Sequence, residues 1–260
     1  MHLTREQMLS EMGIAPLWTL RDEKPESPPD KVASMVQTAP AQDVQPAFAP
    51  APPDIAPVTM PVLATAATEA TAVDGLNWAE LEAGIRACRA CGLCQQRKQA
   101  VPGVGDRQPD WLFIGEGPGA EEDVKGEPFV GQAGKLLDAM LAAIDLQRGN
   151  KVYIANAVKC RPPGNRTPEA SEMAACRPWL QRQIDLLQPR IIVLLGKAAV
   201  HTVLGNDKSL ASLRGQRFDY QNIPVVVTYH PAYLLRNLPD KAKAWEDLLL
   251  ARRLMQSRTA

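Results

Sequence analysis

Five cysteines give this sequence of 260 residues its clearest chemical signal: Cys88, Cys91, Cys94, Cys160 and Cys176. Cys88 and Cys91 form a C-x-x-C pair, whereas Cys160 and Cys176 lie far along the chain. Two thiolates from one loop and two from distant elements suit either a tetrahedral zinc ion or a [4Fe–4S] cluster. The spacing does not separate these two, and Cys94 competes with Cys91 for a place. An odd number of cysteines argues against a disulfide framework.

A glycine-rich segment follows the apolar run 111–114, with glycine at positions 115, 117 and 119. Glycines in such a loop let backbone amides approach a ligand closely. Two nucleotide-binding motifs are nevertheless excluded. The pattern G-x-G-x-x-G lacks its third glycine because position 120 is Ala, and a P-loop fails because Gly134-Lys135 is followed by Leu136. The segment therefore indicates either a plain strand-to-helix turn or a ligand site of another kind.

Polar groups stand at the ends of four apolar runs, 111–114, 152–158, 191–196 and 224–228. These groups are Glu116 with Gly117, Asn156, Gly196 with Lys197, and His230. In open α/β sheets, ligands bind beyond the carboxyl ends of the strands. We therefore expect the four strand ends to converge on one site.

Segments with helical spacing of apolar residues separate these runs. They are 76–89, 132–146, 168–188, 197–204 and 240–257, and Thr167 is the predicted N-cap of the third. Alternating strands and helices predict a three-layer α/β/α domain with a central, mostly parallel four-stranded sheet.

The first 75 residues differ in composition from the rest. They hold eleven of the 23 prolines and carry 4 Lys+Arg against 10 Asp+Glu, whereas the remainder carries 25 against 19. We expect a short amphipathic segment at 1–21, a disordered Pro/Ala-rich linker at 22–75, and a folded domain at 76–260. The segment 1–21 either docks on its own domain or binds a partner protein.

The charge and hydropathy patterns bound the surroundings of the protein. The basic excess after residue 75 is compatible with a polyanionic partner, and equally with an ordinary solvated surface. No apolar run approaches the roughly 20 residues that span a bilayer, and the start lacks the layout of a signal peptide. We expect a cytoplasmic monomer that does not enter membranes.

Taken together and in this order, the motifs resemble those of the family 4 (iron–sulfur) uracil-DNA glycosylases. They are Gly115-Glu-Gly-Pro-Gly119, Pro128-Phe129-Val-Gly131, Asn156-Ala-Val-Lys-Cys160-Arg-Pro-Pro and His230-Pro-Ala, with Cys88-x-x-Cys91 ahead of them. The resemblance covers roughly residues 80–255. It implies a uracil-DNA glycosylase-like fold and a [4Fe–4S] cluster held by Cys88, Cys91, Cys160 and Cys176, with Cys94 outside the set.

The resemblance also implies an activity and roles for particular residues. The enzyme would hydrolyse the N-glycosidic bond of a flipped-out deoxyuridine in single- or double-stranded DNA, releasing uracil and leaving an abasic site. Phe129 would stack on the base, and Asn156 would read its edge in a pocket that includes Gly117. His230 would donate a hydrogen bond to uracil O2 as the bond breaks. Glu116 either orients the attacking water or only shapes the pocket.

Residues around the His230 motif are candidates for contact with DNA. Leu234 or Leu235 would wedge into the gap left by the flipped base. Candidate phosphate contacts are Arg236, Lys197, Arg161 and Arg166.

No lysine stands out as a Schiff-base nucleophile, so we expect no lyase step. Residues 160–168 contain no histidine, so we expect turnover without a covalent DNA adduct. The alternative function is a non-catalytic iron–sulfur module that binds DNA or senses redox state.

Overall fold

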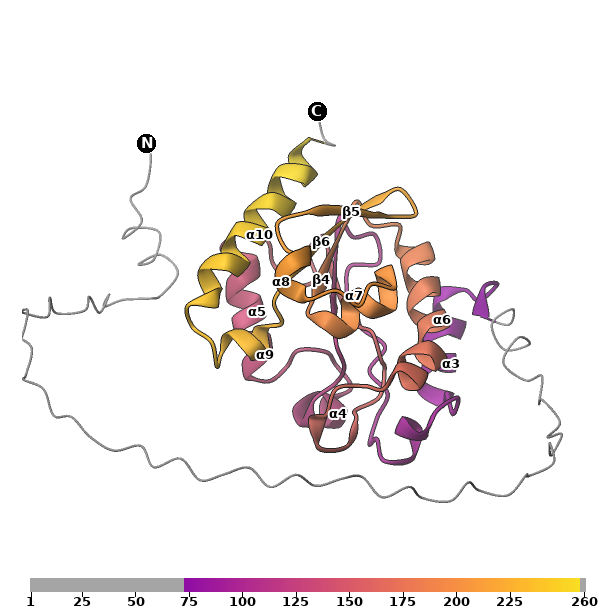
Figure 1. Ribbon diagram of the computed structural model, residues 1–260. Helices are drawn as coiled ribbons and strands as arrows, with labels where there is room; N and C mark the ends of the chain where they lie inside the picture. Colours follow the sequence, from indigo (N-terminus) through magenta and orange to yellow (C-terminus); the bar gives the residue numbers. More distant parts are fainter. Residues whose placement is uncertain (1–72, 258–260) are drawn as a thin grey trace, which may run out of the picture. The chain divides into compact units, whose positions relative to one another are not determined.

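The computed structural model describes residues 73–257, all of which belong to one compact unit (Figure 1). The predicted segment 1–21 and almost all of the predicted linker 22–75 lie outside the described residues. The first described side chain, Val73, is buried and packs with Leu81 and Ile85.

Six strands form one sheet in the order β1-β3-β2-β4-β6-β5. The strands are β1 (Val104–Gly105), β2 (Trp111–Gly115), β3 (Val152–Asn156), β4 (Ile191–Leu195), β5 (Arg217–Tyr220) and β6 (Ile223–Thr228). The four inner strands pair in parallel, and β1 and β5 pair antiparallel at the two edges. The four predicted strands are confirmed, because each is an uninterrupted buried run. The edge strands were not predicted, because β1 has only two residues and β5 is nowhere fully buried.

Helices follow most of the strands. They are α3 (Trp78–Ala87), α4 (Ala120–Lys125), α5 (Gln132–Ala142), α6 (Ala170–Leu187), α7 (Lys197–Leu204), α8 (Leu210–Leu213), α9 (Pro231–Leu234) and α10 (Asp240–Gln256). Two 3₁₀ turns lie at Gly92–Gln95 and Pro163–Asn165. The five predicted helices are confirmed within a few residues at their ends. The short helices α4, α8 and α9 were not predicted, because four to six residues are too few to establish a helical period.

The helices cover both faces of the sheet. Leu180 of α6 and Val200 of α7 pack on one face, and Leu141 of α5 and Leu248 of α10 pack on the other. Figure 1 shows α5 and α10 on one side and α3, α6 and α7 on the other. This confirms the three-layer α/β/α arrangement, now with a mixed, mostly parallel sheet of six strands. Within residues 73–257, no helix has the length and apolar content to cross a membrane.

The N-cap of α6 differs from the prediction. The backbone N–H of Glu169 donates to the Glu172 carboxylate at 2.8 Å, so Glu169 is the cap and the helix begins at Ala170. Thr167 was therefore the wrong choice. Its side chain forms a hydrogen bond with Glu116 instead, at the carboxyl end of the sheet.

Candidate functional site

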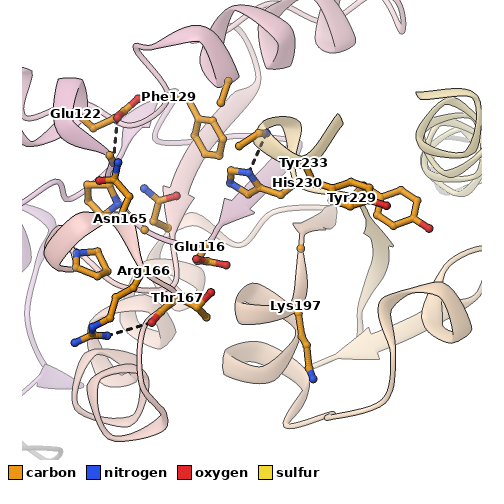
Figure 2. A pocket seen from close by; sticks show the side chains of 18 of the residues that line it. Glu116, Glu122, Phe129, Asn165, Arg166, Thr167, Lys197, Tyr229, His230 and Tyr233 are labelled. Atoms are coloured by element: carbon orange, nitrogen blue, oxygen red, sulfur yellow. Dashed lines mark hydrogen bonds between the residues drawn. The ribbon is translucent and has the colours of Figure 1, made fainter. Parts of the chain in front are cut away.

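A cavity of about 720 Å³ lies beyond the carboxyl ends of the parallel strands. The sequence-predicted residues that line it are Glu116, Gly117, Phe129, Asn156, Arg166, Gly196, Lys197, His230 and Arg236. The loop after β2, the end of β3, the start of α7 and the end of β6 all contribute, so the four strand ends do converge. Figure 2 shows the rings of Phe129 and His230 close together, with Glu116 nearby.

Phe129 is held in an unusual backbone conformation. Its φ is 55°, in the left-handed region that non-glycine residues rarely adopt. Arg148 stabilises this turn, because its guanidinium donates to the carbonyls of Pro128 and Phe129, each at 2.9 Å. A Cβ on Gly134 would lie only 1.8 Å from the Phe129 carbonyl oxygen, so glycine is required where α5 passes the turn. The Phe129 ring stacks at 5.4 Å from the His230 ring.

Asn156 ends β3 beside Gly115 of β2. A Cβ on Gly115 would approach both the Asn156 Oδ1 and the Phe129 ring to 2.5 Å, so only glycine lets these two side chains lie this close. The Asn156 side chain is buried, and its Oδ1 has no hydrogen-bond partner in the part of the chain that is described. An unpaired buried acceptor costs about 1–3 kcal/mol. An N–H group of a ligand would remove this cost.

His230 is prepared as a hydrogen-bond donor. It caps α9, and its Nδ1 accepts the backbone N–H of Ala232 at 3.2 Å. A neutral imidazole that accepts at Nδ1 carries its proton on Nε2. Burial lowers the pKa of His230 to about 4, so the ring is neutral at physiological pH. Gly196, at φ +95°, lies against the His230 Cβ and leaves room for the ring.

Glu116 is half-buried at the start of the loop after β2. Burial raises the pKa of its carboxyl group, and the hydrogen bond with Thr167 partly opposes this shift. A carboxylate with a raised pKa is a better proton acceptor than a solvated one. Figure 2 shows Glu116 and Thr167 side by side at the cavity.

Glu122 joins the two glycine-rich loops and was missed by sequence reasoning. Its carboxylate accepts backbone N–H bonds from Gly119 at 3.0 Å, Val130 at 2.9 Å and Gly131 at 3.1 Å. These bonds hold the loop after β2 against the turn that carries Phe129. The only signal in the sequence is an acidic residue between two glycine-rich stretches, which predicts no partner.

The two predicted wedge residues have different environments. Leu234 is only 1% exposed and packs with Tyr229 and Ala244, so burial removes it as a candidate. Leu235, the residue that caps the end of α9, is 42% exposed. Of the two, only Leu235 has a side chain exposed enough to insert into DNA.

The predicted phosphate contacts also divide. Lys197 and Arg236 line the cavity and are exposed. Arg166 also lines the cavity, but its guanidinium forms a two-pronged ion pair with Glu172, at 2.7 and 2.8 Å, and Arg161 donates to Asn165 at 2.7 Å. These last two guanidinium groups are occupied in fixing the 160–168 loop.

The cysteines line a second, smaller cavity. It is bordered by all five of them, from the end of α3, the 3₁₀ turn at 92–95, the loop after β3, and α6. Arg97 donates to Cys160 Sγ at 2.8 Å, and the backbone N–H of Lys159 donates to Cys176 Sγ at 3.3 Å. No three Cys, His, Asp or Glu side chains among the described residues are grouped so as to hold one metal ion. The five thiols around this cavity are soft donors of the kind that bind a zinc ion or an iron–sulfur cluster.

Comparison with known proteins agrees with this geometry. The sequence profile described as the Uracil DNA glycosylase superfamily matches residues 102–249. A type-4 uracil-DNA glycosylase of Sulfurisphaera tokodaii is 43% identical over 171 residues, covering 63% of this chain and 77% of the relative. One of Thermotoga maritima is 44% identical over 161 residues, covering 61% and 83%. A type-5 enzyme of Thermus thermophilus is 31% identical over 159 residues, covering 48% and 72%.

The profile match spans more than half of the chain, and the type-4 relatives share more identical residues with it than the type-5 enzyme does. The protein therefore belongs to the uracil DNA glycosylase superfamily and groups with its type-4 members.

Proposed function

We propose that this protein is a monofunctional uracil-DNA glycosylase that uses Phe129, Asn156 and His230 to extract and release uracil. The observation that carries the proposal is the cavity itself. An aromatic ring, a buried amide with an unpaired oxygen and a neutral imidazole meet there at the ends of parallel strands. These are the groups that a flipped pyrimidine requires.

The Asn156 amide distinguishes uracil from cytosine. Its Oδ1 accepts from uracil N3–H, and its Nδ2 donates to O4. Cytosine presents an acceptor at N3 and a donor at C4, so both contacts would face like groups. Each mismatch leaves a buried group unpaired at a cost of about 1–3 kcal/mol. Phe129 supplies the stacking surface, which any pyrimidine can use.

The bond that breaks joins C1′ of the sugar to N1 of uracil. Its electron pair moves into the base and collects on O2, where His230 donates from Nε2. The sugar becomes oxocarbenium-like, and a water molecule attacks C1′. Glu116 accepts the proton of that water, aided by the position that Thr167 gives its carboxyl group. The products are an abasic site and the uracil anion, which becomes free uracil when it takes up a proton that balances the one released through Glu116.

The surface around the cavity holds the DNA. Leu235 fills the gap left by the flipped nucleotide, and Lys197 and Arg236 contact backbone phosphates at the rim. Because recognition centres on one extruded nucleotide, the substrate is uracil in single- or double-stranded DNA.

The cofactor is a [4Fe–4S] cluster held by Cys88, Cys91, Cys160 and Cys176. When bound, it cross-links the end of α3 to the loop after β3 and to α6. Cys94 borders the same cavity and remains a spectator thiol. We place the enzyme in the cytoplasm as a monomer, where thiols stay reduced.

The segment 1–21 is proposed to bind a partner protein. Deletion of these residues should leave base release from a short oligonucleotide unchanged while it abolishes capture of the partner. Loss of activity on the oligonucleotide would refute the proposal that this segment serves only to bind a partner.

Base release from oligonucleotides tests the proposed function. Iron-loaded protein should release uracil from a strand with one uracil and none from matched cytosine or thymine strands. Asn156→Ala should slow release at least about 30-fold, because it removes two contacts to the base, while Asn150→Ala, at an exposed turn, should not. Binding of DNA without base release would instead identify a non-catalytic iron–sulfur module. A denaturation-resistant DNA adduct would contradict ordinary turnover.

A further inference from the structure

Lys159 is a charged residue in the interior, between the two cavities. Its side chain is 1% exposed, and it borders the cysteine cavity beside Cys160. Burying an ammonium group is costly unless an opposite charge offsets it. No carboxylate in residues 73–257 is seen to pair with it. The groups beside it that would carry negative charge, once a cluster is bound, are the thiols of Cys176 and Cys160.

The Lys159 ammonium makes two hydrogen bonds. It donates to the backbone carbonyl of Asn156 at 2.9 Å and to Gln183 Oε1 at 2.5 Å. Gln183 in turn donates to the Pro102 carbonyl at 2.9 Å. The Lys159 side chain thus joins the end of β3 to α6, and Gln183 joins α6 to the segment before β1.

The backbone of Lys159 is fixed as well. Its N–H donates to Cys176 Sγ at 3.3 Å, and its carbonyl accepts the N–H of Val101 at 2.8 Å. Both ends of this residue are therefore held in place. Its backbone is bonded to the cysteine cage, the name used here for Cys88, Cys91, Cys160 and Cys176 around the second cavity, and its ammonium is bonded to Asn156. Three residues separate the base-reading amide from the thiol of Cys160.

We propose that Lys159 is a positioning residue that couples the cysteine cage to the base-reading Asn156. Its ammonium fixes the Asn156 carbonyl, and hence the direction of the Asn156 side chain, while the thiolate charge of the cage keeps that ammonium in place. This inference rests on the proposed function, because it assumes that Asn156 reads uracil and that the thiols hold a cluster. A shift of about 1 Å in such a group can cost about 100-fold in rate.

Arg97 provides a matched control on the other side of the same cage. Its Nη1 donates to Cys160 Sγ at 2.8 Å, and its Nη2 donates to the carbonyls of Arg86 and Cys88. None of these bonds reaches β3. Loss of either cation removes positive charge near the cluster, but only the loss of Lys159 frees Asn156.

The experiment compares Lys159→Met, Lys159→Gln and Arg97→Met, each with verified iron content. One measurement is the affinity for DNA that carries 2′-fluoro-2′-deoxyuridine, relative to the same DNA with thymidine. The other is the midpoint potential of the cluster. Lys159→Met should reduce the uracil preference about 10- to 100-fold, the loss expected for a charge-assisted hydrogen bond. Lys159→Gln, which keeps a neutral donor, should restore part of it.

All three variants should move the potential to more negative values, because each removes a cation that favours the reduced cluster. Arg97→Met should keep the uracil preference. The proposal is overturned if Lys159→Met keeps the wild-type preference, if its potential is unchanged, or if Arg97→Met loses as much preference. Loss of iron from both Lys159 variants would also overturn the proposal, because the role of Lys159 would then be to keep the cluster bound and not to position Asn156. Asn156→Ala, measured in parallel, separates the two claims: if it keeps the preference, the proposed reading of uracil fails instead.

Discussion

At the scale of single residues, the backbone N–H of Ala232 determines which nitrogen of His230 can donate a hydrogen bond. The N–H of Ala232 occupies Nδ1 and leaves Nε2 as the donor, while burial holds the pKa at about 4. A neutral donor stabilises charge on uracil O2 without prior protonation of the enzyme. In the proposed reaction, catalysis by His230 should therefore be independent of pH across the physiological range.

The low pKa of His230 predicts how stability depends on pH. An unfolded histidine has a pKa near 6.5, so between about 6.5 and 4 the unfolded state binds a proton that the folded state does not. The free energy of unfolding should fall as pH drops through this window, and His230→Gln should flatten the fall. The ring signals of His230, assigned with this variant, should titrate near pH 4 by NMR. Titration near 6.5 would show that the ring is not held neutral.

Glu116 predicts the acid limb of the rate profile. The carboxylate form accepts a proton, and burial raises its pKa, so kcat should fall as pH drops through that raised value. Glu116→Gln should lower kcat about 100-fold and remove this limb, with little change in uracil affinity. Single-turnover rates from pH 4 to 8 measure both effects. Full activity in Glu116→Gln would assign the residue to pocket shape alone.

At the scale of elements, the two glycine-rich loops depend on one carboxylate at the edge of the cavity. Glu122 fastens the loop after β2 to the turn of Phe129 through three N–H bonds. Glu122→Ala should lower the free energy of unfolding by at least about 3 kcal/mol, since hydrogen bonds to charged groups contribute about 1.5–3 kcal/mol each. Urea unfolding tests this, with the exposed neighbour Glu121→Ala as the control. Equal effects of the two variants would contradict the role given to Glu122.

The strands and helices show what a sequence can predict here. Buried runs such as 191–195 and the helical period of 132–142 come from local patterns, and parallel topology then brings Glu116, Asn156 and His230 to one edge. Contacts between distant segments leave no such pattern. The three amides that meet Glu122, the two carbonyls that meet Arg148 and the burial of Leu234 follow only from the folded chain. The wrong N-cap prediction at Thr167 has the same origin. The Glu172 carboxylate, held by Arg166, accepts the backbone N–H of Glu169, and this contact sets the start of α6.

At the scale of the whole molecule, the proposed cluster would link parts of the domain that the sheet alone does not join. Leu81 and Ile85 fix α3 to the fold, but its end and the 3₁₀ turn at 92–95 face the thiols. Removal of iron by oxidation and chelation should lower the melting temperature. Amide hydrogen exchange should rise in 86–97 and in the loop after β3, while β2 and β4 stay protected. Uniform exchange across the domain would contradict a local cross-link.

The central claim is that one extruded uracil lies among Phe129, Asn156 and His230. A crystal structure of the protein with DNA that contains 2′-fluoro-2′-deoxyuridine tests it most directly. We predict the base stacked on Phe129, with N3–H and O4 on the Asn156 amide and O2 within hydrogen-bond distance of His230 Nε2. A uracil that remains in the duplex, or that binds away from these three side chains, would contradict the account.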